Sequence, residues 1–182
     1  MKVHTTHISD VLILEPKVFG DDRGFFLESW NQKNLREQAG IDEFFVQDNH
    51  SKSSKGILRG LHYQLEQPQG KLVRVVTGRV LDVVVDIRKS SPTFGQHFSI
   101  ELNDQNHLQL WVPSGMAHGF VVLSDTADFM YKTTDYYAPQ YERSILWNDI
   151  DLNIDWHLDG ITPSLSDKDK EGVSFKSAEY YD

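Results

Sequence analysis

The stretch "VLDVVVDIR", from Val80 to Arg88, alternates apolar and polar residues with a period of two. Such alternation places successive side chains on opposite faces of a strand. One face holds Leu81, Val83, Val85 and Ile87, and the other holds Asp82, Asp86 and Arg88. The stretch therefore predicts a half-buried strand near the middle of the chain.

Further strand patterns follow on both sides of this stretch. "FSIEL" (Phe98 to Leu102) and "LQLWV" (Leu108 to Val112) alternate in the same way, with the turn residues "NDQN" between them, and "GFVVL" (Gly119 to Leu123) has the composition of another strand. Many short strands with close turns favour a sandwich or barrel, and a jelly roll is expected here. The one helical pattern is "NQKNLREQAG" (Asn31 to Gly40), which begins with a capping Asn and ends in Gly.

Length and composition indicate one globular domain spanning residues 1–182, because no repeat, low-complexity tract or linker interrupts the chain. The chain has no Cys, which excludes disulfides and thiolate metal sites and suits a reducing compartment. Lys and Arg total 18 against 27 Asp and Glu, giving a net charge of −9. This charge disfavours nucleic acid and anionic membrane surfaces as partners.

No segment predicts a membrane span or a secretory signal. The apolar run near the amino terminus, Val11 to Leu14, is only four residues long, and no later run approaches the length that crosses a bilayer. A soluble, cytoplasmic protein is expected.

Two of the eight His residues stand out. His62 in "RGLHYQ" and His118 in "PSGMAH" lie beside glycines and large apolar residues, where a rigid scaffold can direct a side chain into a site. A hydrogen-bonded core histidine is the alternative for both. The others are expected on the surface or in caps, namely His4, His7, His50, His97, His107 and His157.

The surroundings of these two histidines resemble the two short motifs of the cupin superfamily, whose members are double-stranded β-jelly rolls. Gly56 precedes His62 by six residues, and "PSGMAH" has the order Pro-x-Gly-x-x-His. Metal-binding cupins carry His-x-His in the first motif, whereas the second position here is Gln64, and Glu66 follows at a compressed spacing. A neutral amide is a poor ligand for a transition metal, so neither a metal nor another cofactor is expected.

Longer segments resemble a narrower family, the dTDP-4-dehydrorhamnose 3,5-epimerases, from about Val11 to Asp169. The segments are "FGDDRGFFLESW", "FVQDNHSKS", "RGLHYQ", "GKLVRVVTGRVLDVVVDIRKSSPTFG", "LWVPSGMAHGFVVLS", "YKTTDYY" and "LSDKD". The resemblance implies a mainly β fold, a double-stranded β-helix (cupin jelly roll) with a few short helices. It also implies a metal-free isomerase of dTDP-L-rhamnose biosynthesis, which inverts C3 and C5 of dTDP-4-dehydro-6-deoxy-D-glucose to give dTDP-4-dehydro-6-deoxy-L-mannose.

Both carbons lie next to the C4 ketone, so a base can remove each proton and an acid on the opposite face can return one. His62 suits the role of base, since a neutral imidazole with a pKa of about 6.5 accepts a proton near neutral pH. The resemblance assigns Asp169 to orienting His62, as the carboxylate does in a Ser-His-Asp triad. It assigns Tyr131 as the acid and Lys71 to the charge that grows on the C4 oxygen.

Other interpretations of these residues exist on the sequence alone. Without the resemblance, Asp169 would be a solvated turn residue, Lys71 an exposed strand lysine and Tyr131 a core tyrosine. Tyr136 and Tyr137 are rivals of Tyr131 for the acid role, and one of them could instead stack on the base or the sugar.

Arginine suits a pyrophosphate because its planar fork matches the phosphate oxygens, which makes Arg59 and Arg23 candidates. Arg59 precedes His62 by three residues, the wrong parity for one strand face, but a turn or bulge at Gly60 can bring both into one cavity. Arg23 has an equal alternative, pairing with an aspartate in its own turn. The resemblance adds Glu28, Gln47, Asn49, His118, Glu142 and Lys168 as nucleotide or substrate contacts.

The expected partner is a dTDP-sugar, and the resemblance implies a homodimer in which the segment bearing Arg23 and Glu28 completes the partner's site. Related alternatives are a nucleotide-sugar 3- or 5-monoepimerase and a ketoisomerase. A metal-dependent cupin such as an oxygenase and a non-catalytic nucleotide-sugar binding protein are the more distant alternatives. The sequence leaves open which sugar is used and which carbon inverts first.

Overall fold

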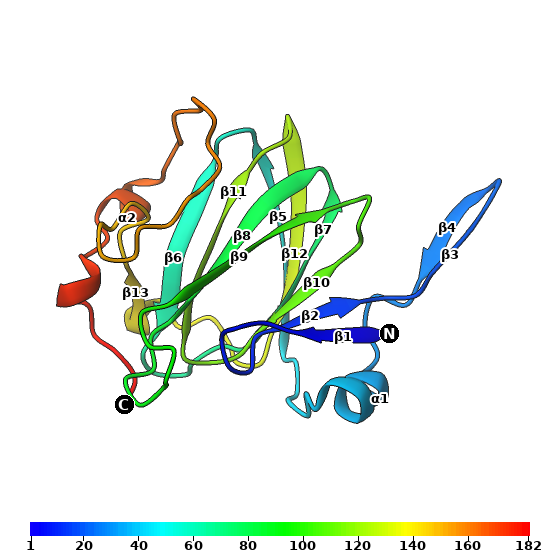
Figure 1. The fold of residues 1–182 in the computed structure, drawn as a ribbon, viewed down its shortest axis with the longest axis horizontal. Helices are drawn as coiled ribbons and strands as arrows, with labels where there is room; N and C mark the ends of the chain where they lie inside the picture. The colour runs from blue at the N-terminus through cyan, green and yellow to red at the C-terminus, as the bar shows by residue number, and fades with distance from the viewer.

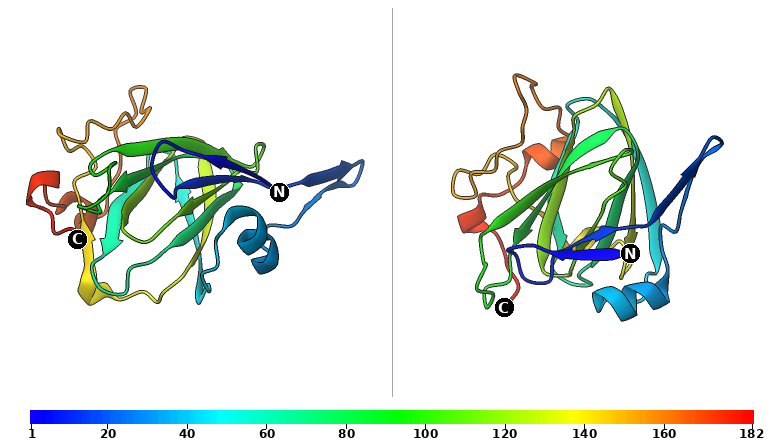
Figure 2. Two further views of the ribbon diagram at one scale, coloured as in Figure 1. Left: turned by 60° about the horizontal axis from the view of Figure 1, so that its bottom comes forward. Right: turned by 45° about the vertical axis from the view of Figure 1, so that its right-hand side comes forward.

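The computed structural model describes residues 1–182 and consists of two large antiparallel sheets that face each other (Figures 1 and 2). The first sheet has the order β1 (Lys2–Thr5), β2 (Leu12–Glu15), β10 (Gln109–Val112), β7 (Lys71–Thr77), β12 (Thr126–Thr133) and β5 (Gln47–Ser54). The second has the order β13 (Glu142–Ser144), β6 (Leu58–Gln64), β11 (Met116–Val122), β8 (Arg79–Asp86) and β9 (His97–Asn103). The predicted mainly β jelly roll is confirmed.

A separate hairpin, β3 (Val18–Asp21) and β4 (Gly24–Leu27), projects away from the two sheets (Figure 1). Its aromatic side chains have few partners within the chain, and Phe19, Phe25 and Phe26 are 53%, 62% and 69% exposed. The hairpin is therefore an apolar arm that its own chain does not cover.

The predicted helix after Asn31 is confirmed and is short. It begins as α1 (Gln32–Asn34) and continues as a π-helical turn, η1 (Leu35–Ala39). The side chain of Asn31 accepts a hydrogen bond from the Asn34 amide, and Gly40 ends the helix in the left-handed conformation. The remaining helical turns are η2 (Pro139–Tyr141), α2 (Asp167–Lys170) and η3 (Phe175–Ser177). None of these helices has the length and apolar character needed to cross a membrane.

Strand β8 is buried on both faces, so the prediction of a half-buried strand is wrong. Val80 and Val84 face the interior between the sheets. Residues 81, 83, 85 and 87 form the opposite face, as their alternation predicted, and pack against the carboxyl-terminal segment through Leu152 and Trp156. Asp82 and Asp86 share the face of Val80 and Val84, which is turned toward the other sheet, so these polar positions are also enclosed and both carboxylates are fully buried.

Strands β6 and β11 come unusually close at Gly60, and their register shifts there between His118 and Phe120. The backbone φ of Gly60 is 129°, and a Cβ at this position would lie 2.5 Å from the Cα of Gly119. Only a residue without a side chain fits both requirements. The irregularity brings Arg59 and His62 to the same cavity, as the turn or bulge predicted at Gly60 from their spacing requires.

We expect Gly60→Ala to lower the free energy of unfolding by about 2 kcal/mol or more, because the new methyl group meets backbone atoms that cannot move aside. Gly160→Ala is the matched control, since Gly160 also has a positive φ but a Cβ there meets nothing within 4 Å. The control should lose only about 1 kcal/mol. Urea denaturation measures both, and equal losses would contradict the close approach as the cause.

Candidate active site

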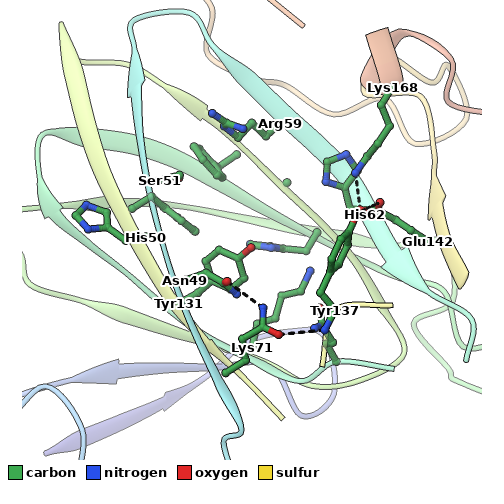
Figure 3. A pocket seen from close by; sticks show the side chains of 16 residues that line it. Asn49, His50, Ser51, Arg59, His62, Lys71, Tyr131, Tyr137, Glu142 and Lys168 are labelled. Atoms are coloured by element: carbon green, nitrogen blue, oxygen red, sulfur yellow. Dashed lines mark hydrogen bonds and ion pairs between the residues drawn. The ribbon is translucent and has the colours of Figure 1, made fainter. Parts of the chain in front are cut away.

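A cavity of about 400 Å³ opens between the two sheets (Figure 3). Its floor includes Phe120 and Phe129, whose rings stack with centroids 4.1 Å apart. Nine of the predicted site residues line it, namely His62, Lys71, Tyr131, Gln47, Asn49, Arg59, His118, Glu142 and Lys168. These residues come from β5, β6, β7, β11, β12, β13 and α2, so long-range folding assembles the cavity.

His62 is hydrogen-bonded through Nε2 to Oδ1 of Asp169 at 2.5 Å. Asp169 lies in the single turn of α2 and its side chain is 3% exposed, which contradicts the interpretation of a solvated turn. Ser166 caps that turn, accepting a bond from the Asp169 amide and donating its hydroxyl to Oδ2 at 2.6 Å. The amide of Gly60 donates to Oδ1 at 3.2 Å. The carboxylate is therefore held from three directions.

The environment keeps His62 neutral and Asp169 ionised. Burial lowers the pKa of His62 below its ordinary 6.5, and the hydrogen bond to Asp169 only partly opposes this effect. Burial alone would raise the pKa of Asp169, but the bonds from His62 and Ser166 outweigh it and hold that pKa at about 2. Since an ionised carboxylate only accepts, the bonded ring nitrogen carries the proton and the other nitrogen keeps a free lone pair.

Tyr131 faces His62 from the other sheet, as Figure 3 shows. Burial raises the pKa of its hydroxyl above the ordinary 10, so Tyr131 is protonated at neutral pH. Lys71 lies in the cavity wall, and burial lowers the pKa of its ammonium to about 8, although Asp82 opposes the shift. A proton acceptor, a proton donor and a cation thus share one cavity.

His118 belongs to a second histidine–carboxylate pair. Its Nε2 lies 2.9 and 3.0 Å from the two carboxylate oxygens of Asp82, and both side chains are buried. Sequence reasoning missed Asp82 because it was assigned to the polar, exposed face of β8. The available signal was a lone carboxylate between Leu81 and Val83, in a strand with enough apolar residues to be buried on both faces.

The rim of the cavity is tied together by polar contacts, several of which are drawn in Figure 3. The hydroxyl of Tyr137 donates to Glu142 at 2.9 Å, and Lys168 contacts the other oxygen of Glu142 at 2.5 Å. Arg59 donates to the hydroxyl of Ser53 at 3.1 and 3.2 Å. Sequence reasoning left Tyr137 as a rival acid, whereas the structure places it at the rim beside Glu142.

Six further lining residues were not predicted as site residues, namely His50, Ser51, Gln69, Gly119, Phe120 and Phe129. His50 is half exposed and bonds Asp128 at 2.8 Å, so it is both a surface histidine, as expected, and part of the cavity edge. Its position beside Asn49 on β5 was the only sequence signal for this role.

Arg23 and Glu28 lie outside the cavity of their own chain. Arg23 pairs with Asp21 in the hairpin turn, and Glu28 accepts bonds from Asn31 at 3.0 Å and Asn34 at 2.7 Å. Their assignment to a substrate site stays a prediction that requires a second chain.

The residues of the cavity do not form a metal-binding set. No group of three or more His, Cys, Asp or Glu side chains is arranged to hold a metal ion anywhere in the chain. Gln64, at the position of the second cupin histidine, is buried and bonds backbone groups instead. The expectation of a metal-free reaction stays a prediction for assay.

Comparison with known proteins identifies many similar chains. The model of one protein family, described as dTDP-4-dehydrorhamnose 3,5-epimerase, matches residues 5–177. A dTDP-4-dehydrorhamnose 3,5-epimerase of Shigella flexneri is 59% identical over 182 residues, covering 100% of this chain and 99% of that one. The protein of the same name from Pseudomonas aeruginosa is 55% identical over 181 residues, with coverage of 100% and 99%.

A solved structure is also similar along nearly the whole chain. The dTDP-6-deoxy-D-glucose-3,5-epimerase RmlC of Legionella pneumophila, crystallised with dTDP-4-keto-L-rhamnose, superposes with a TM-score of 0.95 at 52% identity. The match covers 98% of this chain and 94% of that chain.

Proposed function

The chain belongs to the dTDP-4-dehydrorhamnose 3,5-epimerase family, and we propose that a single proton-transfer pair in its cavity inverts both C3 and C5 of the sugar. The chain is accordingly an isomerase of dTDP-L-rhamnose synthesis, acting on dTDP-4-dehydro-6-deoxy-D-glucose to give dTDP-4-dehydro-6-deoxy-L-mannose. The observation that carries the proposed mechanism is the placement of His62 and Tyr131 on opposite sheets, facing each other across the cavity.

His62 starts the reaction by removing a proton from the carbon next to the ketone. The electrons of the C–H bond form a double bond to C4, and the C4 oxygen becomes an enolate. The imidazolium that results is stabilised by the ionised Asp169, which is already hydrogen-bonded to the ring. The cationic Lys71 in the cavity wall stabilises the enolate oxygen in a site largely screened from water.

Tyr131 completes the inversion by donating its hydroxyl proton to the same carbon from the opposite face. The carbon regains four single bonds, the ketone reforms, and Tyr131 is left as a tyrosinate. A proton from His62, transferred through solvent, restores both groups to their starting forms. The same sequence at the second carbon completes the double epimerisation, and the protein supplies every group that acts.

The cavity can bind a nucleotide diphosphate although the chain is acidic. Arg59, Lys71 and Lys168 line it together, whereas Glu142 is its only lining carboxylate. The local field is therefore positive and favours an anionic ligand. We assign the pyrophosphate to Arg59, whose guanidinium is bonded only to a neutral hydroxyl. Gln47 and Asn49 would contact the nucleotide, and His118, Glu142 and Lys168 the sugar side of the cavity.

The completed enzyme is proposed to be a cytoplasmic homodimer. The exposed aromatic side chains of the β3–β4 hairpin need a partner surface, because aromatic residues are enriched at interfaces and costly to leave in water. A crossing of this hairpin into a second chain would also bring Arg23 and Glu28 toward a cavity that they do not reach in their own chain.

A monoepimerase is the second candidate and shares every group described so far. It would exchange protons at one carbon only, because the cavity would accept the sugar ring in a single orientation that brings only that carbon to His62 and Tyr131. Inversion at a single carbon also needs a base and an acid, so His62, Asp169 and Tyr131 suit both candidates. The 59% and 55% identities to proteins named dTDP-4-dehydrorhamnose 3,5-epimerase favour the double epimerase.

Purified wild-type protein in the presence of a chelator should convert dTDP-4-dehydro-6-deoxy-D-glucose into a product that a stereospecific reductase reduces to an L-sugar nucleotide.

His62→Ala should abolish this turnover and keep its affinity for dTDP, because the base acts on the sugar. Tyr131→Phe should lower inversion by about 10²-fold or more while proton exchange continues on the face of His62. Parallel loss of dTDP affinity in His62→Ala, or full inversion in Tyr131→Phe, would contradict these roles.

The pH profile of kcat/KM should be bell-shaped. Activity falls as the pH drops through the pKa of His62, below 6.5, because the protonated ring cannot accept a proton. It falls again as the pH rises through about 8, because Lys71 loses its charge. Lys71→Arg should move the alkaline limb upward, since a guanidinium stays charged. An unchanged alkaline limb in this variant would assign it to another group.

Sedimentation of the wild-type protein should give twice the mass of one chain. A Phe25→Ser/Phe26→Ser double variant should shift the protein toward the monomer and raise KM, because the aromatic arm would no longer anchor in the partner. Retention of the dimer with wild-type KM would show that the hairpin is not the interface.

A further inference from the structure

Gln64 ends β6, two residues after His62, and its side chain is almost completely buried, at 4% exposure. Every principal hydrogen-bonding group of its amide is used. Nε2 donates to the carbonyls of Gln67 at 2.8 Å and Tyr136 at 3.2 Å, and Oε1 accepts from the amide of Ala138 at 2.9 Å. A buried amide that satisfies its groups on the backbone of a loop fixes that loop in one conformation.

The loop that Gln64 holds contains Tyr137, and the contacts lie on both sides of this residue. The carbonyl before Tyr137 and the amide after it both bond Gln64, while the amide of Tyr137 itself donates to Oε1 of Gln47 at 3.1 Å. Two glutamine side chains therefore bind three polar groups of the backbone around Tyr137. Removing either glutamine side chain would leave at least one of these backbone groups without its partner.

The fixed backbone determines where the Tyr137 side chain goes. Its ring is about half exposed at the cavity edge, and its hydroxyl donates to Glu142 at 2.9 Å. Glu142 is also the cross-strand neighbour of Gln64 in the β13–β6 pair. Gln64 thus anchors both the donor and the acceptor of this rim contact, the first through its side chain and the second through its backbone register.

We propose that Gln64 is a positioning residue of the epimerase, which holds Tyr137 against Glu142 so that the tyrosine forms one wall of the substrate site. The inference rests on the proposed function. Gln64 is not among the residues that line the cavity, and its side chain bonds neither His62 nor Tyr131. It therefore contributes to binding of the sugar nucleotide and leaves the chemical step nearly unchanged. The loop needs two hydrogen-bond donors and one acceptor from this position, and the neutral amide of Gln64 supplies all three. A metal-ligating histidine would not supply them.

Gln64→Met tests the proposal, because methionine has a similar length and volume but cannot form these hydrogen bonds. We expect KM for dTDP-4-dehydro-6-deoxy-D-glucose to rise about tenfold or more, from the loss of the bonds that order the loop. The kcat should stay within about threefold of the wild type, the pattern expected when binding common to the ground and transition states is lost. A fall in kcat with unchanged KM would overturn the proposal.

A matched control is available one residue away. Tyr63 is equally buried, lies on the opposite face of β6, and donates its hydroxyl to the carbonyl of Glu179 at 2.7 Å. Tyr63→Phe also removes a side-chain hydrogen bond to the backbone and should lower the melting temperature while leaving KM unchanged. An equal rise of KM in this control would mean that general destabilisation, not the loop, is responsible.

A double-mutant cycle with Tyr137→Ala tests whether Gln64→Met changes KM through Tyr137. If Gln64 acts through Tyr137, then Gln64→Met should add little to the KM of the Tyr137→Ala variant, and the two changes should be strongly non-additive. Additive changes in the free energy of binding would show that Gln64 does not act through Tyr137 and would refute the proposal.

A measurement without turnover separates this inference from the proposed function. Amide hydrogen exchange of the segment 135–141 should accelerate in Gln64→Met and not in Tyr63→Phe, because the Ala138 amide loses its acceptor. Unchanged exchange in Gln64→Met would contradict the role of Gln64 even if the enzyme is active. An inactive wild type with accelerated exchange in the variant would instead contradict the proposed function alone.

Discussion

The hydrogen bond between His62 and Asp169 joins a central strand to a single helical turn near the carboxyl terminus, 107 residues later in the chain. The proposed chemistry requires a neutral imidazole with one protonated nitrogen, and this bond sets that form of the ring. The bonds from His62, Ser166 and the Gly60 amide together hold the pKa of the carboxylate at about 2 despite its burial. Strand β6 positions His62, Ser166 at the cap of α2 positions Asp169, and the carboxyl-terminal segment brings α2 next to β6.

The carboxyl-terminal segment has a second role, which is to bury the outer face of the sheet that carries His62. Trp156 and Leu152 cover β8 on the side away from the cavity, so β8 is enclosed on both faces. A strand enclosed in this way can hold a carboxylate only if it is paired. Asp82 meets that condition by bonding His118, and the same burial that raises the cost of the charge lowers the pKa of Lys71 to about 8.

Residue patterns predicted the parts of the protein that depend on local spacing. The sequence pattern predicted the alternation in β8, the Asn cap of α1, the Gly that ends η1 and the irregularity between Arg59 and His62. Each of these follows from strand parity or backbone conformation. Asp169 was accessible only through family resemblance, since its own neighbourhood is charged. The burial of Asp82 and the loop contacts of Gln64 depend on segments that are distant in sequence, and no local pattern encodes them.

The central claim is that one cavity, using its own side chains, removes and returns protons at two carbons of the same sugar. Proton NMR of dTDP-4-dehydro-6-deoxy-D-glucose with the wild-type protein in heavy water and a chelator tests this claim most directly. We predict deuterium at both C3 and C5, in a product with the L configuration. Deuterium at one carbon alone would indicate a monoepimerase, and no exchange despite tight dTDP binding would contradict catalysis by this site.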